Sequence, residues 1–430
     1  MSKRPIIVDI YAGFGGFSLG FEQAGWDIKA AVEIDPVHAA VHKFNQPNCV
    51  VFPCSIRNLT GLDIRERSGI GNATIDAVIG GSPCQSFSMA GLRDLNDSRN
   101  SLVLEFLRIV LELRPSYFVF ENVKGLTLGK QKRFLDELIQ AFQQNGYSVR
   151  LPWQILNAAN YGVPQKRERL FLLGAKKGLP LPNYPSPSTR LPNNKKVETN
   201  LPLVATCLEA IGDLPEAEEF EALLSRDHVF VKNWETISDY SRQMRSIDDS
   251  SWYFGYKRTW NHSVLTSSRR TNHSSHIRNR FQAAQPGKIE SISRFFKLAE
   301  NGVANTLRAG TDSSRGAHTS PRCIHYSSPR CVTVREMARL HGCPDWVRPH
   351  TTKWHGAREI GNSVPIPLAR AIALEIMQCL EIHPTSPAKI LESLNPNLLS
   401  MTMTQAADYW QIKIPIKARK RFAVSSPELR

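Results

Sequence analysis

A cysteine and a glutamate each follow a strand-like apolar run in the first third of the chain. Cys84 lies in the segment Gly-Gly-Ser-Pro-Cys-Gln (80–85), after the run Ile75 to Ile79, and Glu121 ends the run that starts at Tyr117. The carboxyl ends of neighbouring parallel strands meet at one edge of a sheet, where α/β proteins hold their ligands. We therefore expect a nucleophilic thiol and a carboxyl group at that edge. For the cysteine alone, a buried structural thiol is the alternative.

An amide and two guanidinium groups alternate further along the chain. Gln165, Arg167 and Arg169 precede the apolar run Leu170 to Leu173. Alternate residues of a strand point to the same face, so these three groups share one side if the strand begins here. A solvated charge run is the alternative for any one of them.

A glycine-rich turn opens the chain. The segment Asp-Ile-Tyr-Ala-Gly-Phe-Gly-Gly-Phe (9–17) follows a short strand-like run, and Glu33 stands 20 residues after Gly13. Glycines there permit a tight turn close to a ligand, and the carboxylate can accept hydrogen bonds from ribose hydroxyls. Ser18 occupies the place of the third glycine of the dinucleotide pattern. The turn therefore favours a nucleoside cofactor without phosphates over NAD.

The elements that must position these groups alternate between strand and helix. Helix-like stretches with apolar positions three and four apart cover Ser101 to Leu113 and Lys132 to Phe142, between the strand-like runs. This order predicts an α/β fold, a Rossmann-like core with a doubly wound, mostly parallel sheet. A proline-rich stretch begins near Leu179, periodicity is poor from Arg226 to Arg335, and helix-like patterns return at 333–341 and 364–380.

The composition points to a polyanionic partner. The 430 residues carry a formal charge of +15, and residues 226–335 alone hold 18 Lys and Arg against 8 Asp and Glu. No apolar run reaches the roughly 18 residues that span a bilayer. The eight cysteines contain no CxxC pair, which argues against a disulfide scaffold and fits a reducing cytoplasm. We predict no metal site, although Cys323, Cys331, Cys343, His318 and His325 are candidates by residue type.

Taken in order, these segments resemble the DNA (cytosine-5) methyltransferases, bacterial type. The resemblance rests on seven short motifs spread over most of the chain, with a long variable stretch before the last two: Asp9-x-Tyr-Ala-Gly-Phe-Gly-Gly, Glu33-x-Asp35, Gly81-Ser-Pro-Cys84-Gln, Glu121-Asn-Val, Gln165-x-Arg167-x-Arg169, Val334-Arg-Glu and Gly361-Asn-Ser-Val-Pro.

The resemblance implies methyl transfer from S-adenosylmethionine to C5 of a cytosine flipped out of duplex DNA at a short specific site. Cys84 would attack C6, Glu121 would meet the N3 edge, and Arg169 would contact O2. Arg167 belongs to the same catalytic group by its motif, although it looks more like a packing and backbone-contact residue. Contacts with the substrate base are expected from Pro83, Gln85, Asn122 and Thr306.

The resemblance also implies the cofactor contacts. Phe14 would stack on the adenine, and Glu33 would bind the ribose. Ser55 stands where many relatives have an aspartate that accepts from the adenine amino group, so we expect a weaker contact there and packing from Ile56. The full set of expected cofactor residues is Gly13, Phe14, Gly15, Gly16, Glu33, Ile34, Ile56, Asn362 and Ser363.

We expect four regions: a catalytic and cofactor-binding domain (1–178), a target-recognition domain (179–332), a return segment that completes the catalytic domain (333–384) and a C-terminal extension of unknown role (385–430). Aromatic, amide and basic groups at 252–262 and 267–273 are candidates for DNA contacts. The expected protein is a bacterial, cytoplasmic, nucleoid-associated monomer, with a cognate restriction endonuclease as a possible partner. An RNA cytosine-5 methyltransferase and an inactive DNA-binding relative are the alternatives.

Overall fold

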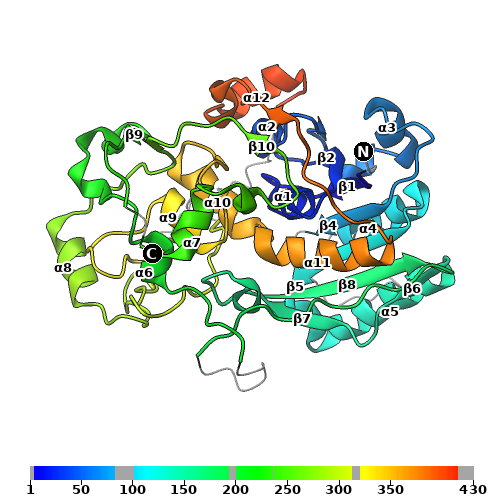
Figure 1. Cartoon of the computed structure of the whole chain (residues 1–430), viewed down its shortest axis with the longest axis horizontal. Helices are drawn as coiled ribbons and strands as arrows, with labels where there is room; N and C mark the ends of the chain where they lie inside the picture. The colour runs from blue at the N-terminus through cyan, green and yellow to red at the C-terminus, as the bar shows by residue number, and fades with distance from the viewer. Residues whose placement is uncertain (1–3, 83–100, 193–199, 236, 312–319, 415–430) are drawn as a thin grey trace, which may run out of the picture.

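The computed structural model describes residues 4–82, 101–192, 200–235, 237–311 and 320–414. Cys84 and its neighbours Pro83 and Gln85 lie outside these ranges, as do His318 and the segment 86–99, which we expect to close over the base. One end of the molecule is an α/β layered unit, and the other is a lobe with little regular structure (Figure 1).

A mixed, mostly parallel sheet forms the centre of the layered unit. Its strand order is β3-β2-β1-β4-β5-β8-β6, with β7 also paired to β8. The first five strands run parallel, whereas β8 is antiparallel to β5. The strands are β1 (Ile6–Ile10), β2 (Asp27–Val32), β3 (Val50–Phe52), β4 (Ala77–Gly81), β5 (Tyr117–Val123), β6 (Tyr147–Val149), β7 (Gln154–Asn157) and β8 (Glu168–Lys176).

Helices cover both faces of this sheet, as the alternating pattern predicts. One face packs against α4 and α5 through side chains such as Phe106 and Leu135, and the other packs against α1 and α11 through Phe21 and Ile372. The fold class is therefore confirmed. The helices of this unit are α1 (Gly16–Gln23), α2 (Pro36–Asn45), α3 (Gly61–Arg67), α4 (Ser101–Leu113), α5 (Lys130–Gln144) and α11 (Ile366–Cys379).

The second lobe contains short helices and two-residue strands. Its core, which includes Cys207, Leu298 and Met337, is continuous with side chains of α1 and α2. Short elements give little periodicity in a sequence, which explains the weak pattern of residues 226–335. The elements of this lobe are α6 (Cys207–Ile211), β9 (Val229–Phe230), α7 (Asp239–Met244), β10 (Lys257–Arg258), β11 (Val264–Leu265), α8 (Ser275–Ala283), α9 (Val334–Leu340) and α10 (Lys353–Asn362).

The C-terminal extension returns across α2. Its strand β12 (Ile390–Leu391) pairs in parallel with β10, and its helix α12 (Met403–Trp410) packs on α2. Trp410 donates its ring N–H to the carbonyl of Pro36 (3.0 Å) at the start of α2. The extension thus joins the second lobe to α2 of the layered unit. Among the described residues, no helix is long and apolar enough to cross a membrane.

Candidate active site

A buried ion pair lies at the carboxyl edge of the sheet. The Nε atom of Arg169 is 3.0 Å from Oε1 of Glu121, and each side chain is about one-tenth exposed. The antiparallel pairing of β5 with β8 sets Arg169 opposite Val123, two residues after Glu121. Burial raises the pKa of Glu121, while the charges of Arg169 and Arg167 oppose the rise. The carboxyl group is therefore closer to protonation than an exposed glutamate.

The neighbouring strand β4 ends beside this pair, three positions before Cys84 in the sequence. Gly81 ends β4 opposite Glu121, and a Cβ added there would lie 2.6 Å from the Glu121 carboxylate. Glycine at this position leaves room for the carboxyl group. The amide of Asn122, itself fully buried, donates to Oγ of Ser82 (2.9 Å). Asn122 therefore anchors the start of the segment that carries Cys84, and its contact with a base stays a prediction.

An open cavity of about 480 Å³ adjoins Arg169. Thr306 enters it from the second lobe, with its hydroxyl donating to the carbonyl of Lys166 (2.7 Å). Two residues that we expect at the base, far apart in sequence, thus line one space. The remaining lining residues are Val123, Lys124, Gly125, Asn157, Lys166 and Glu168.

Arg167 binds backbone carbonyls and is not among the residues that line the cavity beside Arg169. Its buried guanidinium donates to the carbonyls of Leu307 (3.1 Å), Gly361 (2.9 Å) and Ser363 (2.8 Å). These carbonyls belong to the segment of Thr306, to the last turn of α10 and to Ser363, which caps that helix. The packing interpretation of Arg167 fits these contacts, and they give its catalytic grouping no support.

His341, which the sequence does not single out, is buried and shares the Ser363 carbonyl with Arg167. Its Nδ1 accepts a hydrogen bond from the side-chain amide of Gln165 (2.9 Å). Nε2 therefore carries the ring proton and donates it to the carbonyl of Ser363 (3.1 Å). Burial and the charges of nearby arginines lower the pKa of His341 well below its usual range, which keeps the ring neutral. A histidine directly after a helix gives no sequence signal for this role.

The glycine turn and Glu33 meet at the other end of the edge. Gly13 and Gly15 have positive φ angles, and the Gly13 N–H donates to Oε2 of Glu33 (2.9 Å). The other oxygen, Oε1, accepts from the N–H of Asp35 (2.9 Å). Each carboxylate oxygen keeps a further lone pair for a ligand hydroxyl. Ile34, between the two acidic residues, is 61% exposed, which suits a side chain that packs on a ligand.

Other expected cofactor residues lie deeper. Phe14 and Ile56 are 1% and 2% exposed and belong to hydrophobic core clusters. For Phe14 to stack on an adenine, the side chains that now bury it would have to move. The contact stays a prediction. Gly16 is essential for packing, because an added Cβ would lie 1.9 Å from Oγ of Ser363. Asn362 is exposed beside it.

Most of the segment 252–262 does not form a free basic surface. Arg258 forms a nearly buried ion pair with Glu22 of α1 and lies 4.6 Å over the Trp346 ring. Tyr256 donates to Asp27 of β2 (2.8 Å). The charge of Arg258 is already paired inside the protein, and DNA contacts from the rest of this segment stay a prediction.

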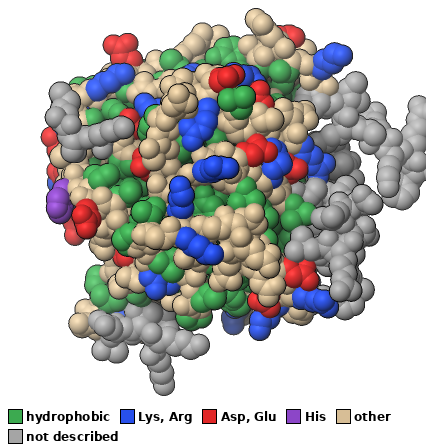
Figure 2. Space-filling view, turned by 90° about the vertical axis from the view of Figure 1, so that its right-hand side faces the viewer, with side chains coloured by type: hydrophobic (Ala, Val, Ile, Leu, Met, Phe, Trp, Pro, Cys, Tyr) green, Lys and Arg blue, Asp and Glu red, His purple; other side chains and the backbone are tan. Residues whose placement is uncertain are grey.

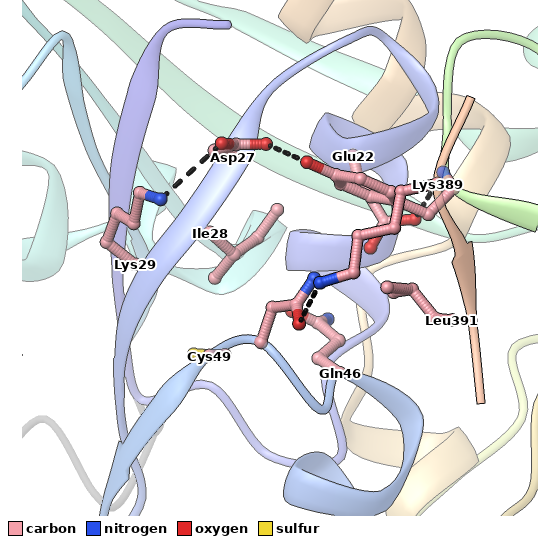
Figure 3. Close-up of a pocket in the computed structure, with 10 residues that line it drawn as sticks. Glu22, Asp27, Ile28, Lys29, Gln46, Cys49, Lys389 and Leu391 are labelled. Carbon is pink, nitrogen blue, oxygen red and sulfur yellow. Dashed lines mark hydrogen bonds and ion pairs between the residues drawn. The ribbon is translucent and has the colours of Figure 1, made fainter. Parts of the chain in front are cut away.

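A second cavity, of about 330 Å³, lies where the C-terminal extension meets α1 and β2 (Figure 3). Lys389 and Leu391 of the extension face Glu22, Asp27 and Gln46 there. None of the residues that we expect in catalysis or cofactor binding lines it. We therefore assign this cavity to the junction between the C-terminal extension and the layered unit, and not to the active site.

Known proteins resemble this chain in sequence and in fold. The family model for the C-5 cytosine-specific DNA methylases matches residues 6–378. The type II methyltransferase M.XorII of Xanthomonas oryzae pv. oryzae is 51% identical over 99% of this chain and 96% of its own length. M.DdeI of Desulfomicrobium norvegicum is 32% identical over 86% and 88%. The crystal structure of a putative prophage-encoded DNA modification methyltransferase from E. coli covers 88% of this chain and 100% of its own, with 28% identity and a TM-score of 0.69.

Proposed function

The chain belongs to the C-5 cytosine-specific DNA methylases and is a DNA (cytosine-5) methyltransferase, and we propose that it works through a covalent bond between Cys84 and C6 of a flipped cytosine. The observation that carries the proposal is the Glu121–Arg169 ion pair, which adjoins the strand leading to Cys84 and a cavity that Thr306 also lines.

The proposed steps follow from the chemistry of these groups. The Cys84 thiolate adds to C6 while Glu121 donates a hydrogen bond or proton at N3, so that electron density reaches C5. Arg169 holds the Glu121 carboxyl and bonds O2. After the methyl group is added, loss of the C5 proton and of the Cys84 thiolate restores the ring as 5-methylcytosine.

S-adenosylmethionine supplies the electrophilic methyl group in this proposal. The glycine turn, Glu33 and the exposed Ile34 suit a nucleoside, because they offer backbone approach, carboxylate acceptors and an apolar face side by side. Ser55 already accepts from the N–H of Arg57 (3.4 Å), consistent with a weak adenine contact at most.

We also propose that residues 179–332 bind duplex DNA. Several arginines of this region are used internally, such as Arg330 with Glu336, so only part of the local charge is free. At the opposite end of the molecule, on the side of α5, basic and acidic side chains are interspersed (Figure 2). The exposed cations of residues 226–311 are Arg226, Lys232, Arg242, Lys288, Arg294 and Arg308.

The test is transfer of labelled methyl groups from S-adenosylmethionine to unmethylated duplex DNA and to transfer RNA, followed by base analysis. We expect label in 5-methylcytosine of DNA, and a loss of roughly 10²–10⁴-fold in single-turnover rate for Glu121→Gln. Glu66→Gln, an exposed position on α3, is the control. Label in N4-methylcytosine, in N6-methyladenine or mainly in RNA would contradict the proposal.

Both named relatives are called type II methyltransferases, so we propose a host restriction endonuclease for the same site. DNA from cells that express the chain should resist cleavage by extracts of its source organism, whereas unmethylated DNA should be cut. Equal cutting of both would contradict the pairing. The chain should elute as a 48.3 kDa monomer.

A further inference from the structure

Two helices bring imidazole and carboxylate groups together beside the cofactor end of the sheet. Asp35 and His38 belong to the start of α2, and His355 belongs to the first turn of α10. One ligand atom from each of these three residues lies within 4.8 Å of the others. Glu359, one turn further along α10, faces the same group, with Oε1 4.0 Å from Nε2 of His38.

The two imidazoles form at most a long hydrogen bond, and the carboxylates lie beyond hydrogen-bond distance of His38. Nε2 of His38 is 3.5 Å from Nδ1 of His355, and Nδ1 of His38 is 4.0 Å from Oδ2 of Asp35. Ligands at roughly 2.0–2.1 Å from a tetrahedral metal ion stand about 3.4 Å from one another. The two imidazoles stand at nearly that spacing, whereas Asp35 faces the other nitrogen of His38 and its carboxylate must shift to share an ion with Nε2.

Glu359 supplies an independent reason to expect a cation. Its side chain is fully buried, and Oε2 accepts from the N–H of His350 (2.8 Å). Oε1 has no hydrogen-bond partner among the described residues. A buried carboxylate oxygen that lies 4.0 Å from the His38 imidazole without a hydrogen bond is typical of an incomplete ligand set.

A protonated His38 is the alternative source of positive charge. An imidazolium between two carboxylates should form short charge-assisted bonds of roughly 2.7–2.9 Å. The distances to Asp35 and to Glu359 are both 4.0 Å. His350, the third histidine nearby, is not a ligand candidate, because Thr352 (3.0 Å) and Met401 (3.1 Å) occupy its two nitrogens.

We propose that Asp35, His38 and His355 bind a divalent transition-metal ion of the zinc type, with Glu359 as the fourth ligand. Two imidazoles and two carboxylates give a mixed nitrogen and oxygen set with a charge of −2, which suits Zn²⁺ or Co²⁺ better than Mg²⁺. Asp35 is about one-fifth exposed, so the ion can reach the site from solvent. The ion joins α2 to α10, and through them the loop of Glu33 to the turn at Ser363.

The experiment is a titration of the full chain, prepared without a histidine tag and stripped with chelator, with ZnCl₂ by calorimetry and with CoCl₂ by visible absorption. We expect one ion per chain with a Kd in the micromolar range or tighter, and intense Co²⁺ bands of a tetrahedral site without a thiolate charge-transfer band. His355→Ala and Glu359→Gln should each weaken Zn²⁺ binding at least tenfold. MgCl₂ should not compete.

His383→Ala, at an exposed histidine outside the cluster, is the matched control and should bind Zn²⁺ like the wild type. Thermal unfolding of each variant without metal shows whether it is folded, and His355→Gln replaces His355→Ala if the alanine variant is not. The proposal is overturned if the wild type binds no Zn²⁺, if folded His355 variants bind it equally well, or if a thiolate band shows that cysteines hold the ion.

Discussion

Replacing Arg167 with methionine tests whether this buried residue positions backbone or takes part in the reaction. Its guanidinium donates to three carbonyls, of Leu307, Gly361 and Ser363. Ser363 keeps a second donor, the Nε2–H of His341, so two carbonyls lose the donor described for them. Each buried acceptor left without a partner costs about 1–3 kcal/mol. Relief from burying a charge offsets part of this loss.

We therefore expect Arg167→Met to lower the free energy of unfolding by about 2–4 kcal/mol, measured by urea denaturation. Arg133→Met is the control, because Arg133 is 77% exposed and its pair with Glu137 is worth less than about 1 kcal/mol. The methyl-transfer rate should fall only as far as folding and cofactor affinity are impaired. A variant as stable as the control that nevertheless transfers no methyl group would refute the positioning role and place Arg167 in the chemistry.

Three further predictions follow from exposure, burial and charge. Ile34→Ser should raise the KM for S-adenosylmethionine about tenfold in steady-state transfer assays, with little change in thermal stability, because the side chain is 61% exposed; an unchanged KM would contradict its cofactor role. Burial raises the pKa of Asp9 from 3.8 to about 7, so the native state binds this proton more tightly than the unfolded chain and loses stability as the pH rises from about 4 to 7. Asp9→Asn should therefore stabilise the protein by up to a few kcal/mol at about pH 8 and hardly at all near pH 4, and equal effects at both would contradict the shift. DNA affinity should fall at least about 100-fold between roughly 50 and 200 mM salt in fluorescence titrations, and near-constant binding would contradict the use of the exposed cations.

The positions of several strands were accessible from the sequence because each buried parallel strand is a short apolar run. The predicted run Ile6 to Ile10 coincides with β1, and Ser101 to Leu113 coincides with α4. The strand was expected to end at Glu121, whereas Asn122 and Val123 continue the ladder with β8. A charged residue can remain in a strand when a neighbouring guanidinium compensates it, and the one-dimensional pattern does not show that neighbour.

Contacts between distant segments were beyond the sequence. The sequence does not distinguish an arginine that contacts DNA from one that pairs inside the protein, as Arg258 does with Glu22, 236 positions away. His341 and the return of the C-terminal extension over α2 also depend on tertiary packing. The resemblance to a family identified Glu121 and Arg169 through short motifs, whereas the Asp35, His38, His355 cluster joins helices more than 300 residues apart and has no such motif.

The covalent role of Cys84 is the central claim, and trapping its adduct tests it most directly. Duplex DNA in which 5-fluorocytosine replaces cytosine should capture the enzyme, because fluorine at C5 cannot leave as the proton does. With S-adenosylmethionine present, mass spectrometry of the digested complex should find the nucleotide on the peptide containing Cys84. The Cys84→Ala variant should form no covalent complex but should still bind DNA. An adduct on another cysteine, or methyl transfer by Cys84→Ala, would contradict the account.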